Sequence, residues 1–117
     1  MVAEEIIKLR EEIPEGISLV AVSKFHPASM IREAYDVGQR LFGESRVQEL
    51  LEKIPLLPED IEWHFIGHLQ TNKVRQLIGK VALIESVDSE KLLALIDSES
   101  RKAGVVTNVL MQDHVAA

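Results

Sequence analysis

The sequence predicts an α/β fold in which βα units build a parallel sheet, about half of a TIM-type (β/α)8 barrel. Five short apolar runs are typical of strands, amphipathic segments separate them, and the units recur at roughly 20 to 25 residues. Right-handed crossovers between such units require the strands to be parallel. A complete barrel typically takes ~250 residues. The chain has 117, so we expect five strands with alternating helices.

The first helix is expected at residues 2–13, where apolar side chains recur at helical spacing and two glutamates occupy the first turn, which the helix dipole favours. Pro14 ends this helix. Residues 18–24 are the next run, apolar until it stops on Lys24. A strand that is apolar on both faces is typical of a buried parallel sheet, so this run is the expected first strand. Pro27 suits the first turn of the helix that follows.

Residues 28–37 place their apolar side chains on one side and stop before a glycine, which predicts the second helix. The short apolar run 40–43 is the expected second strand. Ser45 and Gln48 have the spacing of a capping box, which predicts that Ser45 caps a third helix over residues 45–54.

Residues 61–66 are the expected third strand, closed by a glycine. The alternation of a strand places Trp63 and Phe65 on one face, and His64 and Ile66 on the other. We therefore expect His64 to point to the same interior as the end of the first strand. A core histidine bonded to the backbone is the other reading of this residue.

The remaining runs predict a helix at 71–78, a strand at 80–85, a helix at 89–103 with Asp88 as its N-cap, and a last strand at 105–111. One truncated barrel domain, residues 1–117, is expected to hold all of these elements, with the helix 2–13, βα units 17–104, last strand 105–111 and tail 112–117.

The composition predicts a soluble globule, with 46% hydrophobic and 27% charged residues. The net charge is −6 and the 13 lysines and arginines are scattered, which argues against a nucleic-acid or anionic-membrane surface. There is no cysteine, so disulfides and thiolate metal sites are excluded. No segment approaches the ~18 apolar residues of a membrane span and no signal peptide is evident, so we expect a cytoplasmic location. The four histidines lack metal-ligand spacing, and no phosphate loop is present.

Lys24 is the first candidate site residue because it ends a buried strand. The carboxyl ends of barrel strands face the ligand site, so a lysine there can direct its amine into a site. The alternative is that Lys24 marks the point where the strand meets water, since buried lysines are rare.

Several motifs follow Lys24 along the chain: Phe42-Gly43-Glu44, His64-Phe65-Ile66-Gly67-His68-Leu69-Gln70, Asn72-Lys73 and Ser86-Val87-Asp88. With these motifs, residues 1 to about 112 resemble the amino-terminal half of the pyridoxal phosphate homeostasis protein family. Those proteins are single-domain barrels similar to the amino-terminal domain of alanine racemase. The resemblance implies that Lys24, in its Val-Ser-Lys setting, carries pyridoxal 5′-phosphate as a Schiff base, in a cofactor carrier without a demonstrated reaction.

Two departures from the family pattern affect the expected site. The usual Phe-Gly-Glu-Asn is Phe-Gly-Glu-Ser here, so the hydroxyl of Ser45 replaces an amide. The resemblance also places the family's phosphate-binding loops in a carboxyl half that the chain does not match. We therefore expect weakened cofactor binding.

A Schiff base forms through the neutral amine, so burial or nearby positive charge must lower the pKa of the lysine that holds an aldehyde. Beside Lys24 we expect His64 to stack on or hydrogen-bond to the pyridine ring, with Glu44 and Ser45 near it. First-turn helix charge explains Glu44 equally well. Three other polar residues are expected to be solvated: His68, Asn72 and Lys73.

Three functional readings remain open. The leading one is a non-catalytic pyridoxal phosphate carrier. An amino-acid racemase on the same barrel is the second, although that chemistry needs a second acid/base and the sequence offers no candidate. The third is a truncated or designed half-barrel without a ligand. Because five barrel strands leave two edges and an apolar inner face open, we expect self-association, most simply as a homodimer.

Overall fold

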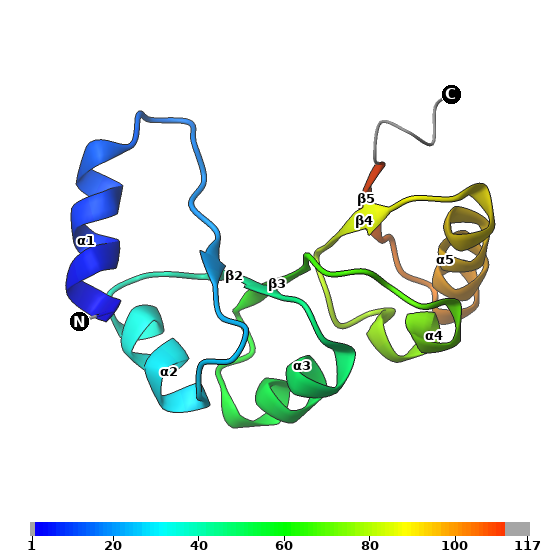
Figure 1. The fold of residues 1–117 in the computed structure, drawn as a ribbon, viewed down its shortest axis with the longest axis horizontal. Helices are drawn as coiled ribbons and strands as arrows, with labels where there is room; N and C mark the ends of the chain where they lie inside the picture. The colour runs from blue at the N-terminus through cyan, green and yellow to red at the C-terminus, as the bar shows by residue number, and fades with distance from the viewer. Residues whose placement is uncertain (1, 112–117) are drawn as a thin grey trace.

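The computed structural model describes residues 2–111, which form one five-stranded parallel sheet (Figure 1). The strands lie in the order of the chain, each paired with the next: β1 (Ala21–Val22), β2 (Leu41–Glu44), β3 (Glu62–Phe65), β4 (Leu83–Val87) and β5 (Asn108–Met111). A doubly wound sheet reverses its strand order near the middle, whereas a barrel does not. The expected half of a TIM-type barrel, with five parallel strands, is confirmed.

Helices alternate with the strands and follow one side of the sheet in Figure 1. They are α1 (Val2–Glu12), α2 (Ala28–Asp36), α3 (Val47–Lys53), α4 (Val74–Leu77) and α5 (Glu90–Ala103), with short 3-10 turns η1 (Ile54–Leu56) and η2 (Thr71–Lys73). Among the described residues, no helix is long and apolar enough to cross a membrane.

The hydrophobic core lies between the helices and the outer face of the sheet. Phe42 of β2 and Trp63 of β3 are paired in register, with ring centroids 5.9 Å apart at an interplanar angle of 44°. Phe65 continues this face, and Leu50 and Leu77 pack onto it from α3 and α4. Side chains of alternate strand residues therefore supply the core, as the sequence alternation predicts for Trp63 and Phe65.

The inner face of the sheet carries the other set of alternate residues. Gly43 and His64 are in register, and a Cβ at Gly43 would meet Ile66 at 3.0 Å and Val20 at 3.5 Å. Val22 is 52% exposed on its strand. On this face the side chains of Ile66 and Val20 therefore pack closely over Gly43, whereas Val22 on the edge strand β1 is open to solvent.

The first and last strands are shorter than the expected 18–24 and 105–111. In β1 only two residues are assigned to the ladder, because the amide of His26 bonds to the carbonyl of Ser23 at 3.0 Å and turns the chain. Before β5, the amide of Val105 still bonds to the carbonyl of Ser100 at 3.0 Å, which completes the end of α5. The expected tail, 112–117, lies outside the described residues.

The predicted capping box at Ser45 is wrong. Arg46 is the N-cap of α3 and makes no side-chain capping bond. Ser45 remains in the segment that leaves β2, and Gln48 instead donates to Glu52 at 3.2 Å, one helical turn ahead. Gln48 thus pairs with Glu52 on the helix surface and does not take part in a capping box with Ser45.

The N-cap of α5 also differs from the expectation. The hydroxyl of Ser89 accepts the amide of Leu92 at 3.1 Å, so Ser89 is the cap and the prediction of Asp88 is wrong by one residue. The helix ends at Gly104 with φ 70°, the left-handed conformation that glycine adopts without strain, as expected. The expected helix 71–78 consists of η2 followed by α4.

Candidate functional site

Lys24 lies in a turn at the carboxyl edge of the sheet, directly after β1. The amide of Ser23 still bonds to the carbonyl of Gly43 at 2.9 Å, so the chain leaves the sheet only at Lys24. Lys24 is exposed, and Phe25 after it has φ 65° and is 64% exposed. The lysine stem is therefore not enclosed by the sheet, and its amine is accessible from solvent.

A buried ammonium lies against this turn. Lys53, near the end of α3, donates from Nζ to the carbonyl of Ser23 at 2.9 Å, to Glu44 Oε2 at 2.8 Å and to Glu49 Oε2 at 2.8 Å. The side chain of Lys53 is 8% exposed and that of Glu44 is 0% exposed. We call Ser23, Glu44, Glu49 and Lys53 the Lys53 cluster. The Lys53 ammonium is paired with both carboxylates, which makes its burial tolerable, whereas Glu44 Oε1 is buried without a hydrogen-bond partner among the described residues.

Glu49 connects the cluster to the far side of the turn. Its Oε2 accepts the amide of Phe25 at 2.7 Å as well as Lys53 Nζ. Partial burial raises the pKa of Glu49, but the hydrogen bonds from Lys53 and Phe25, with the charges of Lys53 and Arg46, outweigh it and hold this pKa below its usual range. Glu49 thus remains ionised and bonded at neutral pH.

Glu44 is held on the helix side of the sheet. It is in register with Phe65, and both side chains are buried. The hydroxyl of Ser23 donates to Glu44 Oε2, the same oxygen that binds Lys53. Glu44 is therefore connected to Lys24 through Ser23, the residue before it.

His64 lies on the inner face of β3, as the alternation predicts. Its Nδ1 is buried without a hydrogen-bond partner among the described residues, and Glu85 Oε2 of β4 is 3.7 Å away. This nitrogen is closed to solvent, so a ligand could reach it only after the neighbouring side chains moved. His64 is one strand beyond β2 and deeper in the barrel than the edge where Lys24 lies.

Ser45 follows β2 at the same edge as Lys24. Its carbonyl oxygen lies so close to Gly67 that a Cβ there would collide with it. A hollow of about 270 Å³ beside Ser45 is also lined by Arg46, His68 and Lys73. Ser45 therefore shares this edge with basic side chains, of which His68 is 70% exposed.

The expected site residues are only partly brought together. Glu44 and Lys24 are joined through Ser23, Ser45 lies at the adjacent strand end, and His64 stands apart on the inner face. The sequence reasoning missed Lys53 and Glu49. One signal was present, because these two residues are spaced i, i+4 on an expected helix, where a glutamate before a lysine is favourable.

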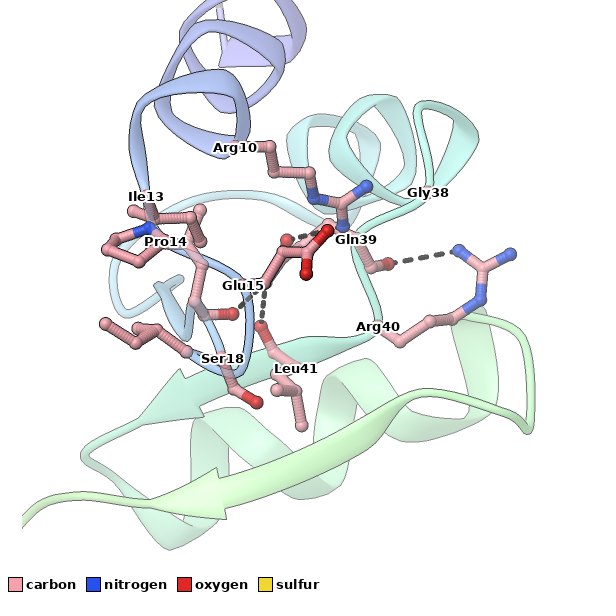
Figure 2. Close-up of a pocket in the computed structure, with 11 residues that line it drawn as sticks. Arg10, Ile13, Pro14, Glu15, Ser18, Gly38, Gln39, Arg40 and Leu41 are labelled. Carbon is pink, nitrogen blue, oxygen red and sulfur yellow. Dashed lines mark hydrogen bonds between the residues drawn. The ribbon is translucent and has the colours of Figure 1, made fainter.

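A second hollow, of about 400 Å³, lies at the amino-terminal end of β1 and β2 and is shown in Figure 2. The side chains of Arg10 and Gln39 in this hollow are bonded to other parts of the protein. Arg10 Nη2 donates to Gln39 Oε1 at 2.8 Å, and Gln39 Nε2 donates to the carbonyls of Leu19 at 2.6 Å and Leu41 at 2.8 Å. These hydrogen bonds therefore connect α1 to the segments that lead into β1 and β2.

The chain is similar in sequence to a group of curated proteins. No protein-family model matches the chain. The pyridoxal phosphate homeostasis proteins of Aquifex aeolicus and Schizosaccharomyces pombe are each 44% identical to it, over 97% and 83% of the chain. The chain is therefore similar to part of the pyridoxal phosphate homeostasis proteins. It spans about half the length of these curated relatives, 52% of the Aquifex aeolicus protein and 42% of the Schizosaccharomyces pombe protein. The expected resemblance is confirmed.

Solved structures agree with this match. PipY of Synechococcus elongatus, in a structure with PLP bound, has a TM-score of 0.88 at 43% identity, over 93% of this chain and 52% of PipY. Alanine racemase from E. faecalis has a TM-score of 0.71 over 84% of this chain and 27% of the racemase. Its identity is 18%, so it shows a shared fold alone.

Proposed function

We propose that the chain binds pyridoxal 5′-phosphate as a Schiff base on Lys24, as a carrier of the cofactor-homeostasis type. The observation that carries this proposal is the place of Lys24, an accessible amine in a hydrogen-bonded turn at the carboxyl edge of the sheet. The match to pyridoxal phosphate homeostasis proteins and to PLP-bound PipY supports the choice of ligand. When bound, the cofactor supplies an aldehyde carbon that reacts with a neutral lysine amine.

The other candidate residues fit this ligand in different ways. His64 is the candidate on the inner face of β3, and its Nδ1 has no hydrogen-bond partner among the described residues. The hydroxyl of Ser45 lies at the edge where Lys24 emerges, beside the basic side chains of Arg46 and Lys73. Glu44 would act indirectly, because it is hydrogen-bonded to Ser23, the residue before Lys24, and to Lys53.

The proposal includes the absence of catalysis. Racemisation on this fold needs a second acid/base on the other face of the cofactor. The relatives are named for cofactor homeostasis, which supports a carrier over an enzyme. Conversion of L-alanine to D-alanine by the chain loaded with pyridoxal phosphate would contradict the proposed absence of catalysis. A cytoplasmic location belongs to the same proposal and is tested by cell fractionation.

We further propose that the chain self-associates. Val22 and Leu110, 52% and 55% exposed, lie on the first and last strands of the sheet. Apolar surface of this kind favours association, most simply as a homodimer. Sedimentation at micromolar concentration tests this, and a monomer at all concentrations would contradict it.

The decisive experiment traps the adduct. The chain is incubated with pyridoxal phosphate, reduced with borohydride, and mapped by mass spectrometry. We expect the label at Lys24, its loss in Lys24→Ala, and its retention in Lys80→Ala, a change at an exposed lysine that precedes β4. A label that persists in Lys24→Ala would contradict the assignment.

A further inference from the structure

We propose that the Lys53 cluster is the positioning device for Lys24, and that Glu49 is its link to the far side of the turn. Within the cluster, Lys53 holds Ser23 on one side of Lys24, and Glu49 holds Phe25 on the other. Neither contact involves the Lys24 side chain, so the amine stays accessible while its backbone is fixed. The consequence for the cofactor rests on the proposed function, whereas the effect on the turn does not.

Lys53 is suited to act as a fixed point. An ammonium has three donors, and those of Lys53 have three acceptors: the Ser23 carbonyl at 2.9 Å, Glu44 at 2.8 Å and Glu49 at 2.8 Å. The Ser23 carbonyl also accepts the His26 amide at 3.0 Å. Because the cluster is buried and its donors are used, it has little freedom to move.

The turn requires such support because of Phe25. Its φ of 65° is in the left-handed region that L residues rarely adopt, and its ring is 64% exposed. Core packing therefore does not hold Phe25 in place. The restraints on it are the hydrogen bond that its backbone amide donates to Glu49 Oε2 at 2.7 Å and the Arg46 guanidinium 4.7 Å from its ring centroid.

A fixed turn matters for covalent capture of an aldehyde. The amine must meet the carbonyl carbon while the rest of the ligand occupies its own contacts, and ordering of a mobile lysine at that moment weakens binding. A turn that is already ordered removes this loss. Loosening the turn should therefore weaken the adduct at Lys24 without unfolding the sheet.

The test variant is Glu49→Ala, which removes the acceptor of the Phe25 amide and one of the three acceptors of Lys53, and leaves the Lys53 to Glu44 pair in place. Its matched control is Glu99→Ala. Glu99 is a comparably buried glutamate, 11% exposed against 19% for Glu49, and it is salt-bridged to Arg75 on another part of the surface. Glu49→Gln is the rescue variant, since its amide oxygen still accepts a hydrogen bond.

Two measurements follow each variant in the full chain. The first is amide hydrogen exchange of Phe25 by NMR without any ligand. We expect it to rise by at least about tenfold in Glu49→Ala, the value of one hydrogen bond to a charged group, to recover in Glu49→Gln and to stay unchanged in Glu99→Ala. The second is the equilibrium constant for adduct formation at Lys24 with pyridoxal phosphate, which we expect to fall several-fold in Glu49→Ala alone.

Equal exchange of Phe25 in Glu49→Ala and Glu99→Ala would overturn the proposal. So would a faster exchange with no change of the Lys24 adduct. If the unmodified chain forms no adduct at Lys24, the proposed function fails, and the exchange of Phe25 still decides whether the cluster fixes the turn. If Glu49→Ala does not fold, Glu49→Asp replaces it with the same expectations, because its shorter side chain keeps the charge but loses reach.

Discussion

Replacement of Lys53 by methionine tests how strongly the Lys53 cluster stabilises the fold. The change keeps most of the side-chain volume but leaves the Glu44 carboxylate, 0% exposed, without its ion pair. Removal of one partner of a buried pair costs about 3–5 kcal/mol, a large share of the ~5–15 kcal/mol that ordinarily stabilises a domain. For a chain of this size, 1 kcal/mol corresponds to about 4 °C, so Tm should fall by roughly 12–20 °C.

The assay is urea unfolding followed by fluorescence of the single tryptophan, Trp63, which is 5% exposed in the core. All variants are compared at one protein concentration, because association shifts apparent stability. Lys102→Met is the control. Lys102 is 67% exposed and pairs with Glu99 on the surface, so its loss should change the free energy of unfolding by less than about 0.5 kcal/mol.

A double variant separates the buried charge from lost packing. In Glu44→Gln/Lys53→Met the carboxylate that Lys53 neutralised is gone, so at least ~1.5 kcal/mol of the loss should return relative to Lys53→Met. A cost below about 1 kcal/mol for Lys53→Met would refute the reasoning. A double variant no more stable than the single one would refute it too.

Three further predictions concern the edge of the sheet and its surface. Gly67→Ala should destabilise the fold by about 1–3 kcal/mol in urea unfolding, because the new Cβ would collide with the Ser45 carbonyl. Ser45→Asn, which restores the family pattern, should strengthen binding of pyridoxal by about 0.5–1.5 kcal/mol, and unchanged binding would mean that position 45 does not contact the ring. The hydrogen bond to Asp60 at 2.6 Å raises the pKa of Tyr35, so the single tyrosine should titrate above its usual value at 295 nm and return towards it in Asp60→Asn. Because the folded pKa is the higher one, this contribution to stability is present at neutral pH and is lost as the pH rises through it.

The sequence by itself determined the order and type of the elements. Apolar runs and helical periodicity are local properties, and the helix between each pair of successive strands acts as a right-handed crossover, which makes the strands parallel. Alternation likewise placed Trp63 and Phe65 on the core face and His64 opposite them. The run that stops at Lys24 marked the carboxyl end of the first strand, although the ladder ends two residues earlier, at Val22.

Only the tertiary structure decided which polar groups meet at that end. Lys53 reaches Ser23 across 30 positions of the chain and Glu44 across 9, and no periodicity relates residues on a turn, a strand and a helix. The sequence allowed Glu44 to be a lining residue or a first-turn helix charge, and the structure places it at the end of β2, buried and bonded to Lys53 and Ser23. A local pattern shows which face a side chain takes, whereas its partner depends on how separate elements pack.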